Sequence, residues 1–176
     1  MLRAWQRWVW ILAALGVAGS ACDFFSSEPS PEEEARAAVE QASTLAGQGR
    51  YAQAAALLGR ASRLDPDNGE IVFQHGIMLA RSGELGQAVM SLRRAASLMP
   101  DRVGPEWQLG LVYARMGKVD ASIKHLETAA RRDKQDPEIL KKLIGMYIKA
   151  ERFVKAERNI RRLKEMIEGD VEIITL

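Results

Sequence analysis

One pattern recurs along this chain at an interval of 34 residues, and it constrains the fold more than any other feature. The recurring positions are a glycine at Gly49, Gly83 and Gly117, a small residue at Ala54, Ala88, Ser122 and Ala156, and an aliphatic residue at Leu58, Leu92, Leu126 and Ile160. They align without a gap. A fixed period of this length predicts stacked supersecondary units, none of which can bury its apolar face alone.

The composition indicates that these units are helical. The chain has 176 residues, of which 47% are apolar and only 6% aromatic. Proline falls between the repeated segments rather than within them, which favours helices over strands. We therefore expect an all-α protein with one repeat domain, because the length and the apolar content suit a single core.

Each unit predicts a pair of antiparallel helices. The recurring glycine permits the positive φ of a helix end, and Pro66 and Pro100 prevent the second helix of a unit from continuing. The small residues at Ala54, Ala88, Ser122 and Ala156 let two helices approach to about 8 to 10 Å. The sequence thus predicts about four helical hairpins, or eight helices, stacked as an α-solenoid.

The first 21 residues have the composition of a signal peptide. Arg3 and Arg7 precede an apolar stretch over residues 8–18, and small residues follow. An uncleaved membrane anchor is the alternative, although the apolar stretch is short for a bilayer span of about 20 residues. Residues 22–30 form the expected tether, and Ser30 is the expected N-cap of the first helix, with a capping box to Glu33.

Cys22 is the only cysteine and lies where cleavage is expected. The segment Gly19-Ser20-Ala21-Cys22 resembles a bacterial lipobox, although Gly19 stands where that motif has an aliphatic residue. The resemblance implies that Cys22 carries lipid and becomes the first residue of the mature protein. We therefore expect a lipid anchor in a bacterial envelope, on the periplasmic face, with the choice between inner and outer membrane left open.

The repeat resembles the tetratricopeptide repeat family over residues 35–168. The positions that carry the resemblance are the small residue at Ala42, Gly76 and Gly110, the larger residue at Leu45, Leu79, Tyr113 and Tyr147, and the proline at Pro66 and Pro100. The resemblance implies repeats at 35–68, 69–102, 103–136 and 137–168 in a domain covering 31–168. The fourth repeat departs from the pattern with Ile144, Glu151 and Leu163.

Composition and motifs argue against several classes of function. Beyond residue 21 there are as many acidic as basic residues, so the basic surface that nucleic acid requires is missing. His75 and His125 have no partners at metal-ligand spacing, and no phosphate-binding loop or nucleophile motif is present. The sequence predicts no catalysis, no cofactor and no metal.

The family resemblance places the binding surface on the inner face of the first helices. The candidate residues are Phe73, Ile77, Arg81, Trp107, Leu111, Arg115 and Lys149. They predict a partner protein with an extended or helical segment, apolar anchors and some negative charge. The alternative is that Phe73 and Trp107 are core between repeats and that the basic residues are a solvated rim.

The C-terminal end poses a separate question. Ile160, Leu163 and Ile167 share one helical stripe, and residues 169–176 form a short apolar tail. We expect the stripe to be covered by the tail reversing at Gly169, by a second copy of the chain, or by a partner.

Together these features predict a membrane-anchored scaffold for assembly of an envelope complex, in a narrower version a pilus or secretion system. The alternatives are a regulatory subunit of an envelope enzyme or transport system, and an assembly factor tethered to the inner membrane by an uncleaved anchor.

Overall fold

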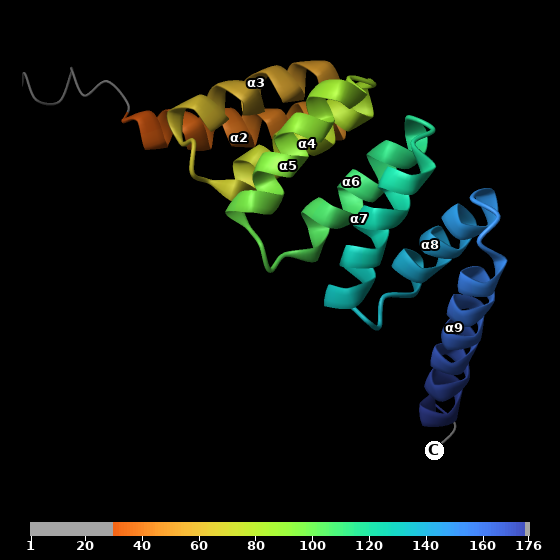
Figure 1. Ribbon diagram of the computed structural model, residues 1–176. Coiled ribbons are helices and arrows are strands. Elements are labelled where there is room, and N and C mark those ends of the chain that lie inside the picture. The colour runs from red at the N-terminus through yellow and green to blue at the C-terminus, as the bar shows by residue number, and fades with distance from the viewer. Residues whose placement is uncertain (1–29, 175–176) are drawn as a thin grey trace, which may run out of the picture.

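The structure is a computed structural model, and it describes residues 30–174. These residues form eight helices arranged as successive antiparallel hairpins (Figure 1). The helices are α2 (Pro31–Gly47), α3 (Tyr51–Leu64), α4 (Gly69–Ser82), α5 (Leu85–Leu98), α6 (Val103–Arg115), α7 (Val119–Arg132), α8 (Pro137–Lys149) and α9 (Phe153–Ile174). The all-α solenoid predicted from the period is confirmed.

Side chains that accept backbone hydrogen bonds begin three of the four hairpins. Ser30 Oγ accepts from the Glu33 amide at 3.2 Å, and Glu33 Oε2 accepts from the Ser30 amide at 2.8 Å, which confirms the predicted capping box. Asn68 and Asp136 cap α4 and α8 in the same way.

The turn inside each hairpin requires a left-handed residue. The φ angles of Gly49, Gly83 and Gly117 are +74°, +95° and +73°. In the fourth hairpin Glu151 occupies the equivalent position with a φ of +56°. The geometry of the turn is therefore kept although the glycine is lost, at the energetic cost that a side chain brings in this region.

Within the second hairpin and within the third, the two helices approach each other closely. A Cβ atom placed on Gly76 would lie 2.7 Å from Leu92 Cγ, and one on Gly110 would lie 2.6 Å from Leu126 Cδ2. Both leucines are fully buried. The predicted packing residues are buried as well, with exposed fractions of 0% for Ala54, Ala88 and Ser122 and 3% for Ala156. Ser122 Oγ donates to the Gly110 carbonyl at 2.7 Å, which satisfies its buried hydroxyl.

Arginines of the second helices form a further contact that the repeat pattern did not indicate. Arg94 of α5 donates to the Pro66 carbonyl at 2.6 Å, and Arg132 of α7 donates to the Arg102 carbonyl at 3.0 Å. Arg162 of α9 donates to the Lys134 carbonyl. Each guanidinium thus reaches the loop that precedes the first helix of its own hairpin and holds that loop against the second helix.

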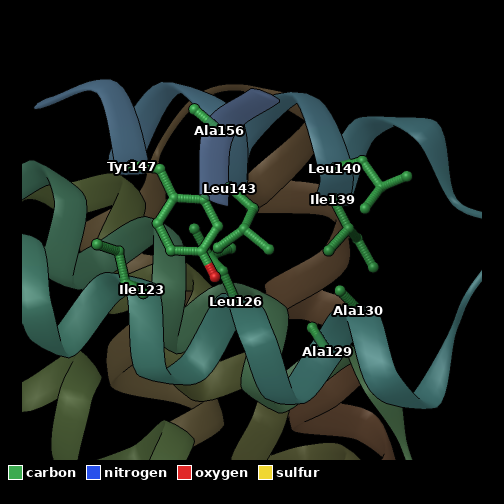
Figure 2. Packing of buried hydrophobic residues seen from close by; sticks show 9 residues of the cluster. All are labelled: Ile123, Leu126, Ala129, Ala130, Ile139, Leu140, Leu143, Tyr147 and Ala156. Atoms are coloured by element: carbon green, nitrogen blue, oxygen red, sulfur yellow. The ribbon is translucent and has the colours of Figure 1, made fainter. Parts of the chain in front are cut away.

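The core is divided into clusters that span neighbouring hairpins. The cluster of the third and fourth hairpins contains Ile123, Leu126, Ala129, Ala130, Ile139, Leu140, Leu143, Tyr147 and Ala156 (Figure 2). Tyr147 adds a polar contact, because its hydroxyl donates to Glu127 Oε1 of α7 at 2.5 Å. Each hairpin therefore completes its core with residues of the next, as expected for a solenoid.

One of the three expected covers for the stripe of Ile160, Leu163 and Ile167, a reversal of the tail at Gly169, is wrong. α9 continues through Gly169 and ends at Ile174, so residues 169–174 lengthen the last helix instead of folding back. Glycine permits a turn but does not impose one, and its cost inside a helix is only about 1 kcal/mol.

The predicted signal peptide, the tether up to Pro29 and Cys22 lie outside the described residues. Among the helices between residues 30 and 174, none has the length and apolar character needed to span a bilayer.

We expect Gly76→Ala to lower the free energy of unfolding by roughly 1 to 3 kcal/mol, because the new methyl group would collide with Leu92. Gly145→Ala is the matched control: Gly145 also lies inside a first helix, but no atom lies within 4 Å of the added Cβ. This control should be neutral or stabilising by up to about 1 kcal/mol. Urea unfolding measures both, and equal effects would contradict the close-approach model.

Candidate protein-binding face of the first helices

The predicted binding residues lie on α4, α6 and α8, the first helices of three successive hairpins. We call the surface formed by Phe73, Ile77, Trp107 and Leu111 the first-helix face. All four side chains are partly buried. They differ in what buries them, and this difference shows which side chains pack between repeats and which can contact a partner.

The two aromatic residues pack between repeats. A Cβ atom on Gly104 of α6 would lie 2.9 Å from Phe73 Cζ, so the Phe73 ring lies directly against the α6 backbone. Trp107 packs against the core cluster of the third and fourth hairpins. Both residues therefore have the packing role that the alternative interpretation gave them. Ile77 and Leu111 belong to none of the three core clusters and remain partly exposed.

Two of the three predicted basic residues also make internal contacts. The Arg81 guanidinium lies over the Tyr51 ring, 5.4 Å from its centroid. Arg115 Nη1 donates to the Ala80 carbonyl at the end of α4, which ties the second repeat to the third. Both side chains stay exposed, as does Lys149. Arg81, Arg115 and Lys149 therefore form an exposed basic edge, and Arg115 also joins two repeats.

A cavity of about 400 Å³ lies between α2 and α4. Its apolar wall is formed by Ala35, Val39 and Ile71, and its charged lining includes Glu32, Arg36, Glu40, Asp65 and Glu70. Four carboxylates against one guanidinium favour a cationic group at this end of the molecule. The sequence did not indicate this site, because Glu32 and Glu70 lie in first helical turns, where acidic residues are common, and only the fold brings Glu40 and Asp65 beside them.

The two histidines lie between helices. His125 Nδ1 is 2.7 Å from Glu106 Oε2, and its ring stacks on Tyr113 with the centroids 5.3 Å apart. His75 Nδ1 is 3.3 Å from Ser91 Oγ. Burial lowers the pKa of His75, and the nearby Arg63 guanidinium lowers that pKa further. Between residues 30 and 168 no three His, Cys, Asp or Glu side chains are grouped so as to hold a metal ion.

The family follows from the repeat geometry and from a sequence comparison. A family model described as tetratricopeptide repeat matches residues 33–102 and 108–169, which is most of the chain. The protein therefore belongs to the tetratricopeptide repeat family. Repeats of this family generally serve as protein-interaction modules rather than enzymes. No curated protein matches the chain in sequence.

Solved structures share the fold at low sequence identity. A crystal structure of MamA is 20% identical with a TM-score of 0.74, and covers 78% of this chain and 81% of its own. MamA residues 41 to the end from Desulfovibrio magneticus RS-1 are 17% identical with a TM-score of 0.72, covering 77% and 76%. YrrB, described as a tetratricopeptide repeat protein with an unusual peptide-binding site, is 19% identical with a TM-score of 0.67, covering 75% and 68%.

We expect the stability of the protein to fall as the pH drops below 6.5, the ordinary pKa of histidine, partly because of His75. Below this pH, His75 binds a proton in the unfolded chain but stays neutral in the folded protein. Acid therefore favours unfolding until the pH falls below the lower pKa of folded His75. His75→Gln should therefore flatten the decrease in unfolding free energy between about pH 7 and pH 5. Urea unfolding across this range tests the idea, and an unchanged slope would contradict it.

Proposed function

We propose that this protein is a membrane-anchored scaffold whose first-helix face binds an extended or helical segment of another protein. The observation that carries the proposal is the pair Ile77 and Leu111. These residues occupy equivalent positions one repeat apart, are partly exposed, and belong to no core cluster. A segment that crosses both repeats can bury two aliphatic side chains at once, which favours binding by about 25 cal/mol per Å² of apolar area.

Charge gives the bound segment a direction. The cavity between α2 and α4 presents four carboxylates, whereas Arg81, Arg115 and Lys149 are exposed at the C-terminal ends of α4, α6 and α8. The preferred segment therefore carries a basic group near the first repeat, apolar side chains at the centre and acidic groups toward the basic edge. The peptide-binding site named for YrrB supports this kind of ligand.

The scaffold acts next to a membrane in this proposal. Lipid on Cys22 would leave about eight residues before α2, and a flexible tether of that length spans roughly 15 Å on average and no more than about 28 Å when extended. A partner bound to the first-helix face is then held close to the bilayer. This arrangement suits assembly of an envelope complex on the periplasmic face, such as a pilus or secretion system.

The double variant Ile77→Ser/Leu111→Ser should weaken partner binding by roughly tenfold or more while the melting temperature changes little, because neither side chain belongs to a core cluster. Crosslinking in cells followed by mass spectrometry identifies the partner and measures its recovery. Met90→Ser is the control, since Met90 is 74% exposed on the second helix α5. Equal recovery with the double variant and wild type would exclude this face as the binding site.

Cys22→Ser should release the protein from membranes or leave an uncleaved precursor, and it should abolish incorporation of labelled fatty acid. Each buried methylene of an acyl chain contributes about 0.8 kcal/mol to membrane affinity, so its loss is a large effect. Cell fractionation and intact-protein mass measure the outcome. If the variant remains at the membrane with the mature mass, the lipid anchor is wrong. If instead the wild-type protein has the mass of the full precursor, the anchor is the uncleaved segment.

A further inference from the structure

The last helix is much longer than the helix it packs against. α9 has 22 residues and α8 has 13, which correspond to about 33 Å and 20 Å at a rise of 1.5 Å per residue. Among the described helices, α9 packs substantially only against α8. The C-terminal part of α9 therefore extends beyond the solenoid (Figure 1).

This helix carries an incompletely covered apolar stripe, which we call the α9 stripe: Ile160, Leu163 and Ile167. Their spacing of three and four residues places them on one side of the helix. Ile160 is 49% exposed and Ile167 is 52% exposed. One repeat earlier, Leu126 occupies the position of Ile160 and is completely buried.

A further repeat would meet a less apolar surface on α9 than α8 meets on α7. The residues of α7 that help form the core with α8 include Ile123 and Ala130. Their equivalents in α9 are Glu157 and Lys164, and both are exposed. Leu126 and Ala129 of α7 belong to the same cluster, and their equivalents in α9 are Ile160 and Leu163. The side on which another repeat would stack is thus partly charged and partly apolar.

The charges of α9 are divided between its two halves. From Phe153 to Lys164 there are five basic residues and one acidic residue, whereas from Glu165 to Ile174 there are four acidic residues and no basic one. This order is the reverse of the one that the helix dipole favours, which has acids at the N-terminus and bases at the C-terminus. The division therefore does not stabilise α9 by itself. Lys155 of the basic half pairs with Glu127 of α7, and the two halves together form a surface that an oppositely charged surface can complement.

We propose that two copies of this chain associate through their α9 helices in antiparallel orientation. Reversing one helix places the basic half of each copy opposite the acidic half of the other, and two-fold symmetry makes this match twice. A symmetry axis between Leu163 and Lys164 brings Ile160 of one copy opposite Ile167 of the other. A parallel pair would instead place like charges together. The association does not depend on what the first-helix face binds.

The test measures the mass of the full-length protein in non-ionic detergent by sedimentation equilibrium, over concentrations up to about 100 μM. Wild type should dimerise. Ile160→Ser/Ile167→Ser should weaken dimerisation by roughly tenfold or more, because the two substitutions remove apolar contacts from both sides of the interface. Val154→Ser is the matched control: Val154 is 76% exposed and lies on the far side of α9 from the stripe, so its replacement should leave the mass unchanged.

Exchanging the charges of α9 provides a second and more specific test of the antiparallel dimer. Arg161→Glu/Lys164→Glu makes α9 acidic overall, and Glu165→Lys/Glu168→Lys makes it basic, so each variant alone should be monomeric. An equimolar mixture of the two should dimerise again, because opposite charges then meet. The intramolecular pairs that these changes break, Arg161–Glu157 at 3.3 Å and Lys164–Glu168 at 3.6 Å, are exposed and contribute little to folding.

Circular dichroism of every variant shows whether α9 remains helical. Restored dimerisation in the mixture, together with loss in the stripe variant, would support the proposal. A monomeric wild type would overturn it and leave the stripe to a different protein. Dimerisation that survives the stripe and charge variants, or a mixture that stays monomeric although both variants are folded, would overturn it equally.

Discussion

The structure depends on the approach of two helices to a distance at which only a small residue fits between them. Gly76 and Gly110 lie against Leu92 and Leu126, and neither glycine has room for a methyl group. Because the second and third hairpins repeat this contact, they present nearly the same surfaces to their neighbours, and stacking follows from repetition. Both helices of a hairpin supply large buried side chains, such as Leu109 of α6 and Leu126 of α7, while Ile77 and Leu111 of the first helices stay partly exposed.

The steric part of this arrangement could be predicted from the sequence, because a small residue, its large neighbour and a turn glycine are all local features. The arginine contacts were harder to predict: Arg94 and Arg162 are two periods apart, but Thr128 stands at the intervening position and Arg132 makes the contact of the third hairpin instead. The role of Phe73 was also beyond a sequence argument. The position of a residue in a helix determines the side from which its aromatic ring projects, but the rotation between repeats decides whether α6 covers the Phe73 ring.

Binding and inter-repeat packing share residues on the first-helix face. Phe73 contacts the α6 backbone, and Arg115 ties the end of α4 to α6, yet both adjoin the exposed side chains proposed to bind a partner. A segment lying across α4 and α6 therefore contacts the joint between two repeats. Such a ligand binds the folded stack and not the unfolded chain, so it must also stabilise the fold by mass action.

The departures of the fourth repeat from the period have connected structural consequences. Ile144 stands where Gly110 makes room for Leu126, and it is itself 9% exposed and so fills that space. The residue equivalent to Leu126, Ile160, is half-exposed, whereas Leu126 is completely buried. Replacement of a glycine by a large residue in the first helix thus accompanies exposure of Ile160 in the second, without any change in the turn, which Glu151 preserves at φ +56°. The loss of periodicity thus coincides with the end of the tight glycine contact, and an apolar residue that the earlier repeats bury is left half-exposed at the end of the stack.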